Sequence, residues 1–249
     1  MKAIIVAAGL GSRMQELTEA RPKCSLPIND QPIFDHQLDA LRAIGIYDIS
    51  VVVGHSADFF DNYPEVKKYS NPHYKQNNVL LSLMAAGSEM DSDMVVCYSD
   101  IIYREDVLRN LFPLQAHFTA VADVDWRETY VGRSDHPVSQ AENVVITNGL
   151  IETIGKHVEA DESSAEFIGI FALSKEGCAI WKDVFDDVRS RFSEHPFQQA
   201  ATLNNAYLTD MIQELIDRGF PVTTHLIKGG WMEIDTEQDY RSAQHAFRK

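Results

Sequence analysis

Short apolar runs alternate with amphipathic stretches along the first half of the chain. Continuous apolar runs, rich in β-branched residues, predict buried strands over residues 3–6, 49–53, 94–98 and 118–124. Apolar residues spaced three and four apart predict a helix over 33–44, which Gly45 ends, and another that begins at Asn78. This alternation predicts an α/β fold: a Rossmann-like, mostly parallel mixed sheet with helices on both faces.

The second half mixes strands and helices with one long polar segment. The patterns predict a hairpin over 144–151 turning at Asn148-Gly149, strands over 167–173, 222–227 and 231–235, and helices over 174–188 and 198–219. Thr236 and Asp239 resemble a capping box that begins a final helix. Residues 125–143 are rich in charged side chains and poor in apolar ones, which predicts a loop or lid. We expect a single domain over 1–249 with a small appended β and loop region.

Composition and charge narrow the classes of partner. The formal net charge of −15 argues against a nucleic acid polymer, which needs a basic face, but not against a nucleotide held by a local cation and a metal. Cys24, Cys97 and Cys178 show neither metal-ligand spacing nor a disulfide framework. No apolar segment is long enough for a signal-peptide core or a membrane span, so we expect a cytoplasmic protein without a membrane partner. The sequence leaves open whether the chain forms a homodimer.

The first strand runs directly into the small-residue loop AAGLGSR, residues 7–13. Small residues let backbone N–H groups approach a ligand, and a strand followed by a Gly-rich turn commonly holds phosphate. The loop lacks the Gly-Lys-Ser/Thr ending of a Walker A motif. It also has Met14 where the dinucleotide-binding pattern needs a third small residue. Arg13 and Lys23 add two cations nearby in the sequence.

Carboxylates follow two of the predicted strands. Asp100 comes just after strand 94–98, so it should lie at the same sheet edge as the Gly-rich loop. Asp235 ends the short strand 231–235, and Glu233 points to the same side because strand side chains alternate. One or two carboxylates suffice to hold Mg²⁺, so the sequence predicts a magnesium site.

The longer pattern around these residues resembles a known family. AAGLGSRM, Leu17-Thr18, Arg21-Pro22-Lys23 and Leu26-Pro27, followed by Asn78, Ser82, Asp100, the Glu-x-Asp pair and Tyr240, resemble the bacterial CTP:phosphocholine cytidylyltransferases and the cytidylyltransferases of phosphonate biosynthesis. The resemblance implies a GT-A-like nucleotidyltransferase that transfers CMP from CTP to a small phosphorylated or phosphonate acceptor and releases pyrophosphate.

The same resemblance implies a role for each matched residue. Lys23 and Arg13 would be catalytic and grip the phosphates, while Asp100, Asp235 and Glu233 would hold Mg²⁺. The nucleotide would contact Ala7, Ala8, Gly9, Gly11, Ser12, Asn78 and Ser82.

The polar segment 125–143 is the expected acceptor site. Arginines can hold a phosphate or phosphonate, and aromatic rings can receive a cationic amine. The candidates are Trp126, Arg127, Tyr130, Arg133 and His136. Two alternatives stay open: a sugar-1-phosphate nucleotidyltransferase using UTP or dTTP, and a non-catalytic nucleotide sensor. Glu16 stands where hexose-1-phosphate enzymes usually have proline before Leu-Thr, which favours a small acceptor.

Overall fold

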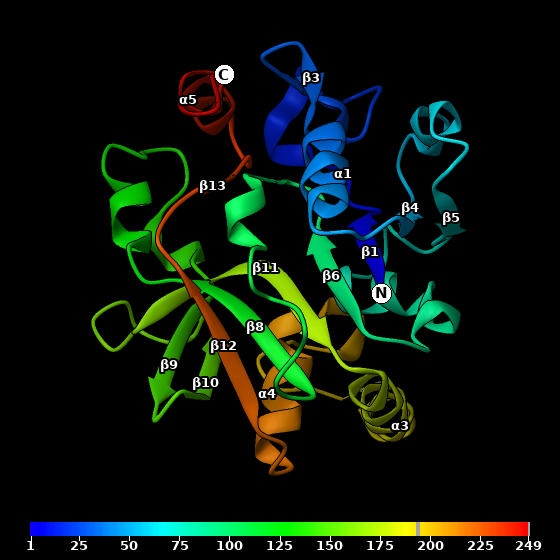
Figure 1. Ribbon diagram of the computed structural model, residues 1–249, viewed down its shortest axis with the longest axis vertical. Coiled ribbons are helices and arrows are strands. Elements are labelled where there is room, and N and C mark those ends of the chain that lie inside the picture. The colour runs from blue at the N-terminus through cyan, green and yellow to red at the C-terminus, as the bar shows by residue number, and fades with distance from the viewer. Residues whose placement is uncertain (193–194, 249) are drawn as a thin grey trace.

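The structure is a computed structural model that describes residues 1–192 and 195–248. Its centre is a nine-stranded sheet in the order β5-β4-β1-β6-β11-β8-β12-β10-β9 (Figure 1). In that order the strands are Lys67–Ser70, Asp48–Val53, Lys2–Ala7, Met94–Tyr98, Ala165–Leu173, Phe118–Asp123, Val222–Ile227, Leu150–Gly155 and Asn143–Thr147. The α-helices are α1 (Ile33–Ala43), α2 (Val79–Met84), α3 (Lys175–Phe192), α4 (Leu208–Asp217) and α5 (Glu237–Ala246).

Most strands of the sheet run in one direction. β5, β4, β1 and β6 pair in parallel, as do β8 and β12, whereas β10 and β11 run opposite to the other strands. Ala7 lies opposite Val53, and Val6 lies opposite Tyr98, so three central strands end at one edge. The predicted mostly parallel mixed sheet is confirmed, and this edge is where such sheets bind ligands.

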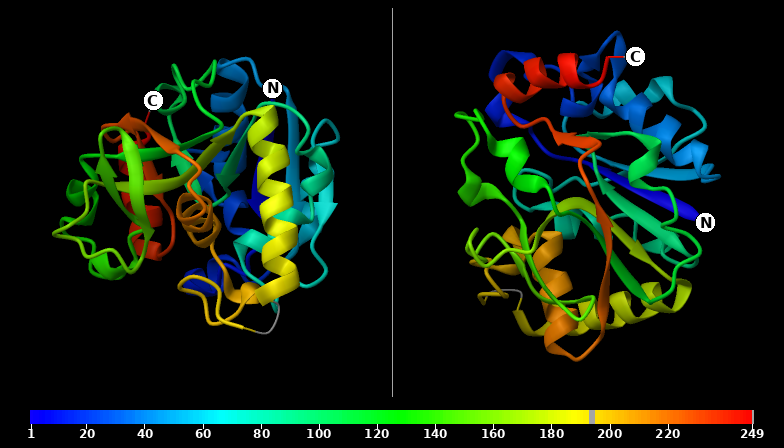
Figure 2. Two further views of the ribbon diagram at one scale, coloured as in Figure 1. Left: turned by 90° about the horizontal axis from the view of Figure 1, so that it is seen from below. Right: turned by 60° about the vertical axis from the view of Figure 1, so that its left-hand side comes forward.

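The sheet is buried on both faces, as the continuous apolar strands predicted. Side chains of β1 alternate between two cores because successive residues point to opposite faces. Ile5 belongs to the core that includes α1 and α5, and Ile4 belongs to the core that includes α2, α3 and α4. Figure 2 shows α3 and α1 on opposite sides of the sheet.

Two small antiparallel sheets lie beside the main one. β2 (Pro27–Ile28) pairs with β3 (Gln31–Pro32), and β7 (Ile101–Tyr103) pairs with β13 (Trp231–Glu233). The second pairing sets Glu233 opposite Ile101, immediately after Asp100. The Ile234 N–H also donates to the Asp100 carbonyl at 2.8 Å. Backbone hydrogen bonds therefore hold the segment that carries Asp100 against the segment that carries Glu233 and Asp235.

Most expected elements are confirmed, and two are wrong in part. The strand expected over 231–235 ends at Glu233, so Asp235 lies just beyond it. The hairpin turns at Asn148-Gly149, and the capping box of Thr236 and Asp239 begins α5. The helix predicted over 198–219 begins only at Leu208, because the Asp210 carboxylate accepts from the Tyr207 N–H at 2.7 Å and caps it there. Upstream of that cap the chain forms an isolated β-bridge between Phe197 and Ala200 and a short 3-10 helix at Leu203–Asn205 instead.

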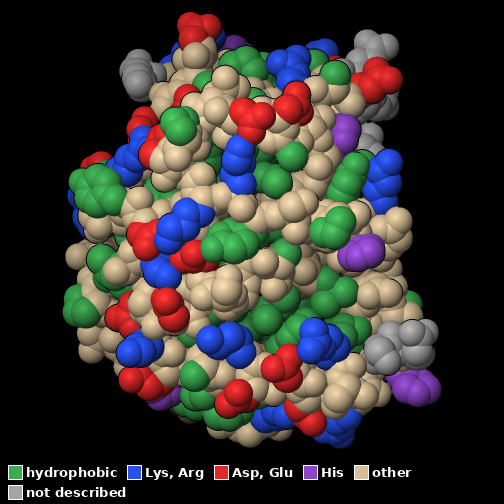
Figure 3. Space-filling model, turned by 90° about the vertical axis from the view of Figure 1, so that its right-hand side faces the viewer, with side chains coloured by type: hydrophobic (Ala, Val, Ile, Leu, Met, Phe, Trp, Pro, Cys, Tyr) green, Lys and Arg blue, Asp and Glu red, His purple; other side chains and the backbone are tan. Residues whose placement is uncertain are grey.

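One face of the surface carries charges of both signs. On the face seen in Figure 3, acidic and basic side chains are interspersed rather than gathered into a basic stripe. Among the described residues, no helix is long and apolar enough to cross a bilayer.

Gly169 is a position where the fold requires glycine. It has φ +80° in β11, where the register against β8 shifts, and a Cβ there would lie 2.5 Å from the Tyr98 ring. We expect Gly169→Ala to lower the free energy of unfolding by about 1–3 kcal/mol through backbone strain, with a further loss from the clash. Urea denaturation measures the change.

Gly132→Ala is the matched control for this prediction. Gly132 has φ +78°, but a Cβ there meets nothing within 4 Å, so it reports backbone strain alone. Equal destabilisation by the two substitutions would show that contact with Tyr98 does not matter.

Candidate active site

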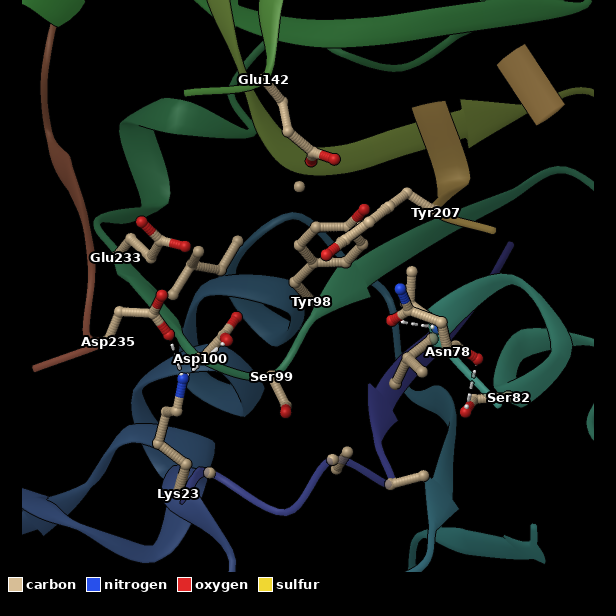
Figure 4. Close-up of a pocket in the computed structure, with 18 of the residues that line it drawn as sticks. Lys23, Asn78, Ser82, Tyr98, Ser99, Asp100, Glu142, Tyr207, Glu233 and Asp235 are labelled. Atoms are coloured by element: carbon tan, nitrogen blue, oxygen red, sulfur yellow. Dashed lines mark hydrogen bonds and ion pairs between the residues drawn. The ribbon is translucent and has the colours of Figure 1, made fainter. Parts of the chain in front are cut away.

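A pocket of about 380 Å³ opens at the sheet edge where β1 and β6 end (Figure 4). The loop after β1, the start of α2, the end of β6 and the segment after β13 all line it. The structure therefore brings together the residues predicted for nucleotide, catalysis and metal: Ala7, Ala8, Gly9, Gly11, Arg13, Lys23, Asn78, Ser82, Asp100, Glu233 and Asp235. The side chain of Ser12 lies outside the described residues.

The Gly-rich loop is fixed by a residue of the same motif. Thr18 Oγ1 donates to the Gly11 carbonyl at 2.8 Å, while Gly11 takes φ +64°. A Cβ on Gly9 would meet no protein atom within 4 Å, so the loop leaves open space on its pocket side. Such a loop can admit a large anion close to its backbone.

Asn78 and Ser82 stand at the start of α2, with part of their polar groups already engaged. Asn78 Oδ1 accepts from the Val79 N–H at 2.8 Å, and its Nδ2 donates to the Asn205 carbonyl at 2.9 Å. Ser82 Oγ accepts from Asn71 at 2.9 Å. These bonds orient both side chains at the pocket wall. Their contact with a nucleotide stays a prediction.

Lys23 bridges two carboxylates that lie far apart in the sequence. Its Nζ lies 3.0 Å from Asp100 Oδ2 and also donates to Asp235 Oδ1. Burial would lower the pKa of Lys23, but the charges of Asp100 and Asp235 raise it above its usual value. The pocket thus keeps a charged ammonium at the point where the two strand ends meet.

Asp235 is the most heavily contacted acid in this group. Burial would raise the pKa of Asp235, but the hydrogen bond to His136 and the charges of Lys23 and Arg13 hold it well below its usual range. Arg13 forms an ion pair with Asp235 from the end of the Gly-rich loop. The two predicted catalytic cations therefore lie on one carboxylate.

The acidic groups fit a divalent cation. Asp100 and Asp235 both reach one nitrogen, so their oxygens can be at most about 6 Å apart, given hydrogen bonds of roughly 3 Å. Oxygen ligands of this kind suit Mg²⁺. One ligand atom each of His136, Glu233 and Asp235 also lie within 4.8 Å of one another.

His136 lies among these acids rather than beside an acceptor. Its Nδ1 is 3.3 Å from Asp235 Oδ2, and its Nε2 is 3.5 Å from Glu233 Oε2. Burial raises the pKa of Glu233, and the neighbouring charges of Asp235 and Asp100 raise it further. The buried imidazole therefore lies between the two carboxylates.

Arg133 is also used within the protein. Its guanidinium donates to both oxygens of Asp239, at 2.6 and 3.0 Å, and to Glu233 Oε2 at 3.2 Å. Asp239 Oδ2 in turn accepts from the Asp235 N–H at 3.1 Å. Arg133 therefore orients the Glu233–Asp235 segment and is not free to hold an acceptor phosphate.

The remaining predicted acceptor residues pack the loop itself. Trp126 is fully buried, and the Arg127 guanidinium lies 4.5 Å from its ring centroid. Tyr130 donates to Glu166 Oε1 at 2.6 Å. None of Trp126, Arg127, Tyr130, Arg133 and His136 lines this pocket in the structure, so the pocket does not support their assignment to the acceptor, which stays a prediction. Residues 125–143 reach the pocket instead through Gln140, directly before Glu142 of the same wall.

Glu142 and Glu166 form an acidic end of the pocket that the sequence analysis missed. In Figure 4, Glu142 lies across the pocket from Lys23, beside Tyr98 and Tyr207. Burial raises the pKa of Glu142 to about 7 and that of Glu166 to about 8. The sequence held one signal for this pair: Glu166 is the single charged residue in the apolar run 165–173.

Glu142→Gln tests this burial through the pH dependence of stability. Because the folded protein binds the Glu142 proton more tightly than the unfolded chain, Glu142 costs stability as the pH rises from 4.5 to about 7. At pH 8 the variant should be more stable than wild type by up to about 3 kcal/mol, and near pH 4.5 the two should be nearly equal. Urea denaturation at both pH values, with exposed Glu162→Gln as control, measures this. A difference that does not change with pH would contradict it.

Comparison with known proteins places this geometry in a family. Residues 3–169 match the MobA-like NTP transferase domain. The chain is 31% identical to a CTP:phosphoglutamine cytidylyltransferase of Campylobacter jejuni, over 96% of this chain and 97% of that protein. The chain belongs to the MobA-like NTP transferase family. The nucleotidyltransferase resemblance seen in the sequence is confirmed.

Two further likenesses support this MobA-like fold. A choline-phosphate cytidylyltransferase of Streptococcus pneumoniae is 32% identical over 48% of this chain and 53% of that protein. The solved structure of a CTP:phosphocholine cytidylyltransferase from the same organism superposes with a TM-score of 0.75, at 22% identity and 99% coverage of both chains. A putative glucose-1-phosphate thymidylyltransferase from Bacillus anthracis gives 0.76 at 19% identity, covering 100% of this chain and 96% of that one.

Proposed function

We propose that this MobA-like enzyme transfers CMP from CTP to a small phosphorylated or phosphonate acceptor and releases pyrophosphate. The observation that carries the proposal is that Lys23, Asp100 and Asp235 meet in the pocket that the Gly-rich loop also lines. The relatives named as cytidylyltransferases of phosphoglutamine, choline phosphate and 2-aminoethylphosphonate support the choice of CTP.

The reaction joins two anions, so its barrier is largely electrostatic. An oxygen of the acceptor phosphate or phosphonate attacks the α-phosphorus of CTP and forms a new P–O bond. The bond from the α-phosphorus to the bridging oxygen breaks, and its electron pair leaves with pyrophosphate. Lys23 and Arg13 stabilise the charge that develops on the phosphates, and fixed donors of this kind lower such barriers most.

The acidic residues would hold Mg²⁺ on this proposal. Asp100 and Asp235 would supply oxygen ligands, with Glu233 in support. When bound, the metal would neutralise phosphate charge and orient the reactants. His136 and Arg133 keep the carboxylates in place through the contacts described above.

The acidic end of the pocket favours an acceptor with a cationic amine. Glu142 and Glu166 are buried without a cation within ion-pair distance among the described residues, so an ammonium group would relieve their burial. Tyr98 and Tyr207 add ring faces at the same end. A neutral sugar would leave the carboxylates of Glu142 and Glu166 without a cationic partner.

A panel of four nucleoside triphosphates against several acceptors tests the proposal by pyrophosphate release. CTP should exceed UTP, ATP and GTP in kcat/KM by at least about tenfold, or roughly 1.4 kcal/mol. Aminoalkyl phosphonates or phosphocholine should serve and glucose 1-phosphate should not. Matching rates with UTP and glucose 1-phosphate would overturn the proposal.

A further inference from the structure

Lys156 is a pocket residue that none of the roles above uses. It follows β10, directly after Gly155 with φ +134°, and its side chain lines the same pocket as Glu142. Its Nζ lies 4.4 Å from the Tyr207 ring centroid and 3.4 Å from Gln140 Oε1. Among the described residues no carboxylate comes within 4.0 Å of this ammonium. Lys156 is therefore a partly buried cation with only a weak neutral partner.

The carboxylates at this end have no cation within 4.0 Å in the described part of the chain. The charge of Lys156 lies near enough to oppose the effect of burial on the pKa of Glu142. Glu142 Oε1 accepts from Thr209 at 3.0 Å, and Glu166 Oε1 accepts from Tyr130. Glu166 Oε2 is buried with no hydrogen-bond partner, as is the Tyr98 hydroxyl. Buried polar groups are normally satisfied, so these atoms point to groups that a ligand supplies.

We propose that the acceptor is a phosphorylated α-amino acid, whose ammonium group binds at Glu142 and whose α-carboxylate binds Lys156. This inference rests on the proposed cytidylyl transfer and adds the acceptor's head group to it. An α-amino acid carries an ammonium group and a carboxylate on one carbon. A single ligand of this kind would therefore pair with Glu142 and with Lys156.

Lys156 also discriminates against acceptors that carry an amine alone. An aminoalkyl phosphonate or phosphocholine would bring a cation beside Glu142 and leave Lys156 unpaired near a like charge. Specificity of this kind comes from a penalty on the wrong ligand as much as from contacts with the right one. The substrate in the name of the C. jejuni relative, phosphoglutamine, is an amino acid derivative, which agrees with this reading.

Three matched phosphonates isolate each charge. 2-Amino-4-phosphonobutyrate has both the ammonium and the carboxylate, 3-aminopropylphosphonate lacks only the carboxylate, and 4-phosphonobutyrate lacks only the ammonium. With CTP and Mg²⁺, kcat/KM for the first should exceed that for each of the others by about 10- to 100-fold, the range expected for one charged hydrogen-bonded contact.

Two variants connect these preferences to their residues. Lys156→Met should remove the preference for 2-amino-4-phosphonobutyrate over 3-aminopropylphosphonate. Glu142→Gln should remove the preference over 4-phosphonobutyrate. Neither should raise the KM for CTP, since both residues lie at the acceptor end. Lys68→Met, which removes a surface lysine paired with Asp61, should leave both preferences intact.

The outcomes separate this inference from the proposed function. Pyrophosphate release with equal use of the first two phosphonates, or a preference that survives Lys156→Met, would overturn the amino acid head group and leave cytidylyl transfer standing. An increase in the CTP KM of Lys156→Met, with the acceptor preference unchanged, would assign Lys156 to the nucleotide and overturn the inference too. If neither these phosphonates nor any acceptor of the panel above supported pyrophosphate release, both the inference and the proposed function would be rejected.

Discussion

Replacing Lys23 by methionine is expected to lower kcat by about 10²–10³, the usual loss on removal of one fixed donor to a developing anion. The substitution keeps the apolar stem and removes only the ammonium that lies between Asp100 and Asp235. It also removes one of the two cations paired with the buried Asp235 carboxylate, so it should lower stability by less than the about 3–5 kcal/mol typical of a buried charge left with no partner. Steady-state kinetics on protein that circular dichroism shows to be folded separates the two effects.

Lys2→Met is the matched control. Lys2 is similarly buried and pairs with Glu89 and Asp91, but it lies outside the pocket. Its loss should lower the melting temperature and leave kcat nearly unchanged. If folded Lys23→Met turned over CTP at nearly the wild-type rate, Lys23 would have no catalytic role.

Replacing Asp100 or Asp235 by asparagine is expected to reduce kcat by on the order of 10³ or more, because a metal site supplies several kcal/mol of charge stabilisation. The double variant should be little worse than either single one, since residues that act as a unit are strongly non-additive. Both singles should also need more Mg²⁺ for half-maximal activity. Titration of Mg²⁺ against kcat measures this.

Asp91→Asn is the control for general loss of charge, because Asp91 is exposed and pairs only with Lys2 among the described residues. It should leave the Mg²⁺ requirement unchanged. Multiplicative effects of Asp100→Asn and Asp235→Asn would show that the two carboxylates act independently and would contradict a shared metal.

The end of the pocket formed by the Gly-rich loop and Asp100 was predictable because topology determines it. The loop 7–13 and Asp100 each follow a buried parallel strand, and such strands end at a common edge. Asp235 was predictable only as a carboxylate near a strand end, because it reaches Asp100 through the pairing of β7 with β13, and the three-residue strand β7 was not predicted.

The acidic end of the pocket could not be predicted from local pattern. Arg133 looked available for an anion, but its partner Asp239 is more than one hundred residues away in the sequence. Glu142 and Lys156 stand among many charged residues, and only the packing of β9, β10 and β11 selects them for the pocket. The helix expected over 198–219 begins late for a local reason, the Asp210 carboxylate that caps the Tyr207 N–H.

Transfer of label from α-³²P-CTP distinguishes cytidylyl transfer from hydrolysis of CTP and from transfer of another nucleotide. With Mg²⁺ and 2-amino-4-phosphonobutyrate, 2-aminoethylphosphonate or phosphocholine as acceptor, label should appear in a CMP–acceptor conjugate. Unlabelled pyrophosphate should form in equal amount, and Asp235→Asn should nearly abolish both. Labelled CMP released to water without a conjugate, or equal transfer from α-³²P-UTP, would contradict the assignment of this enzyme as a cytidylyltransferase.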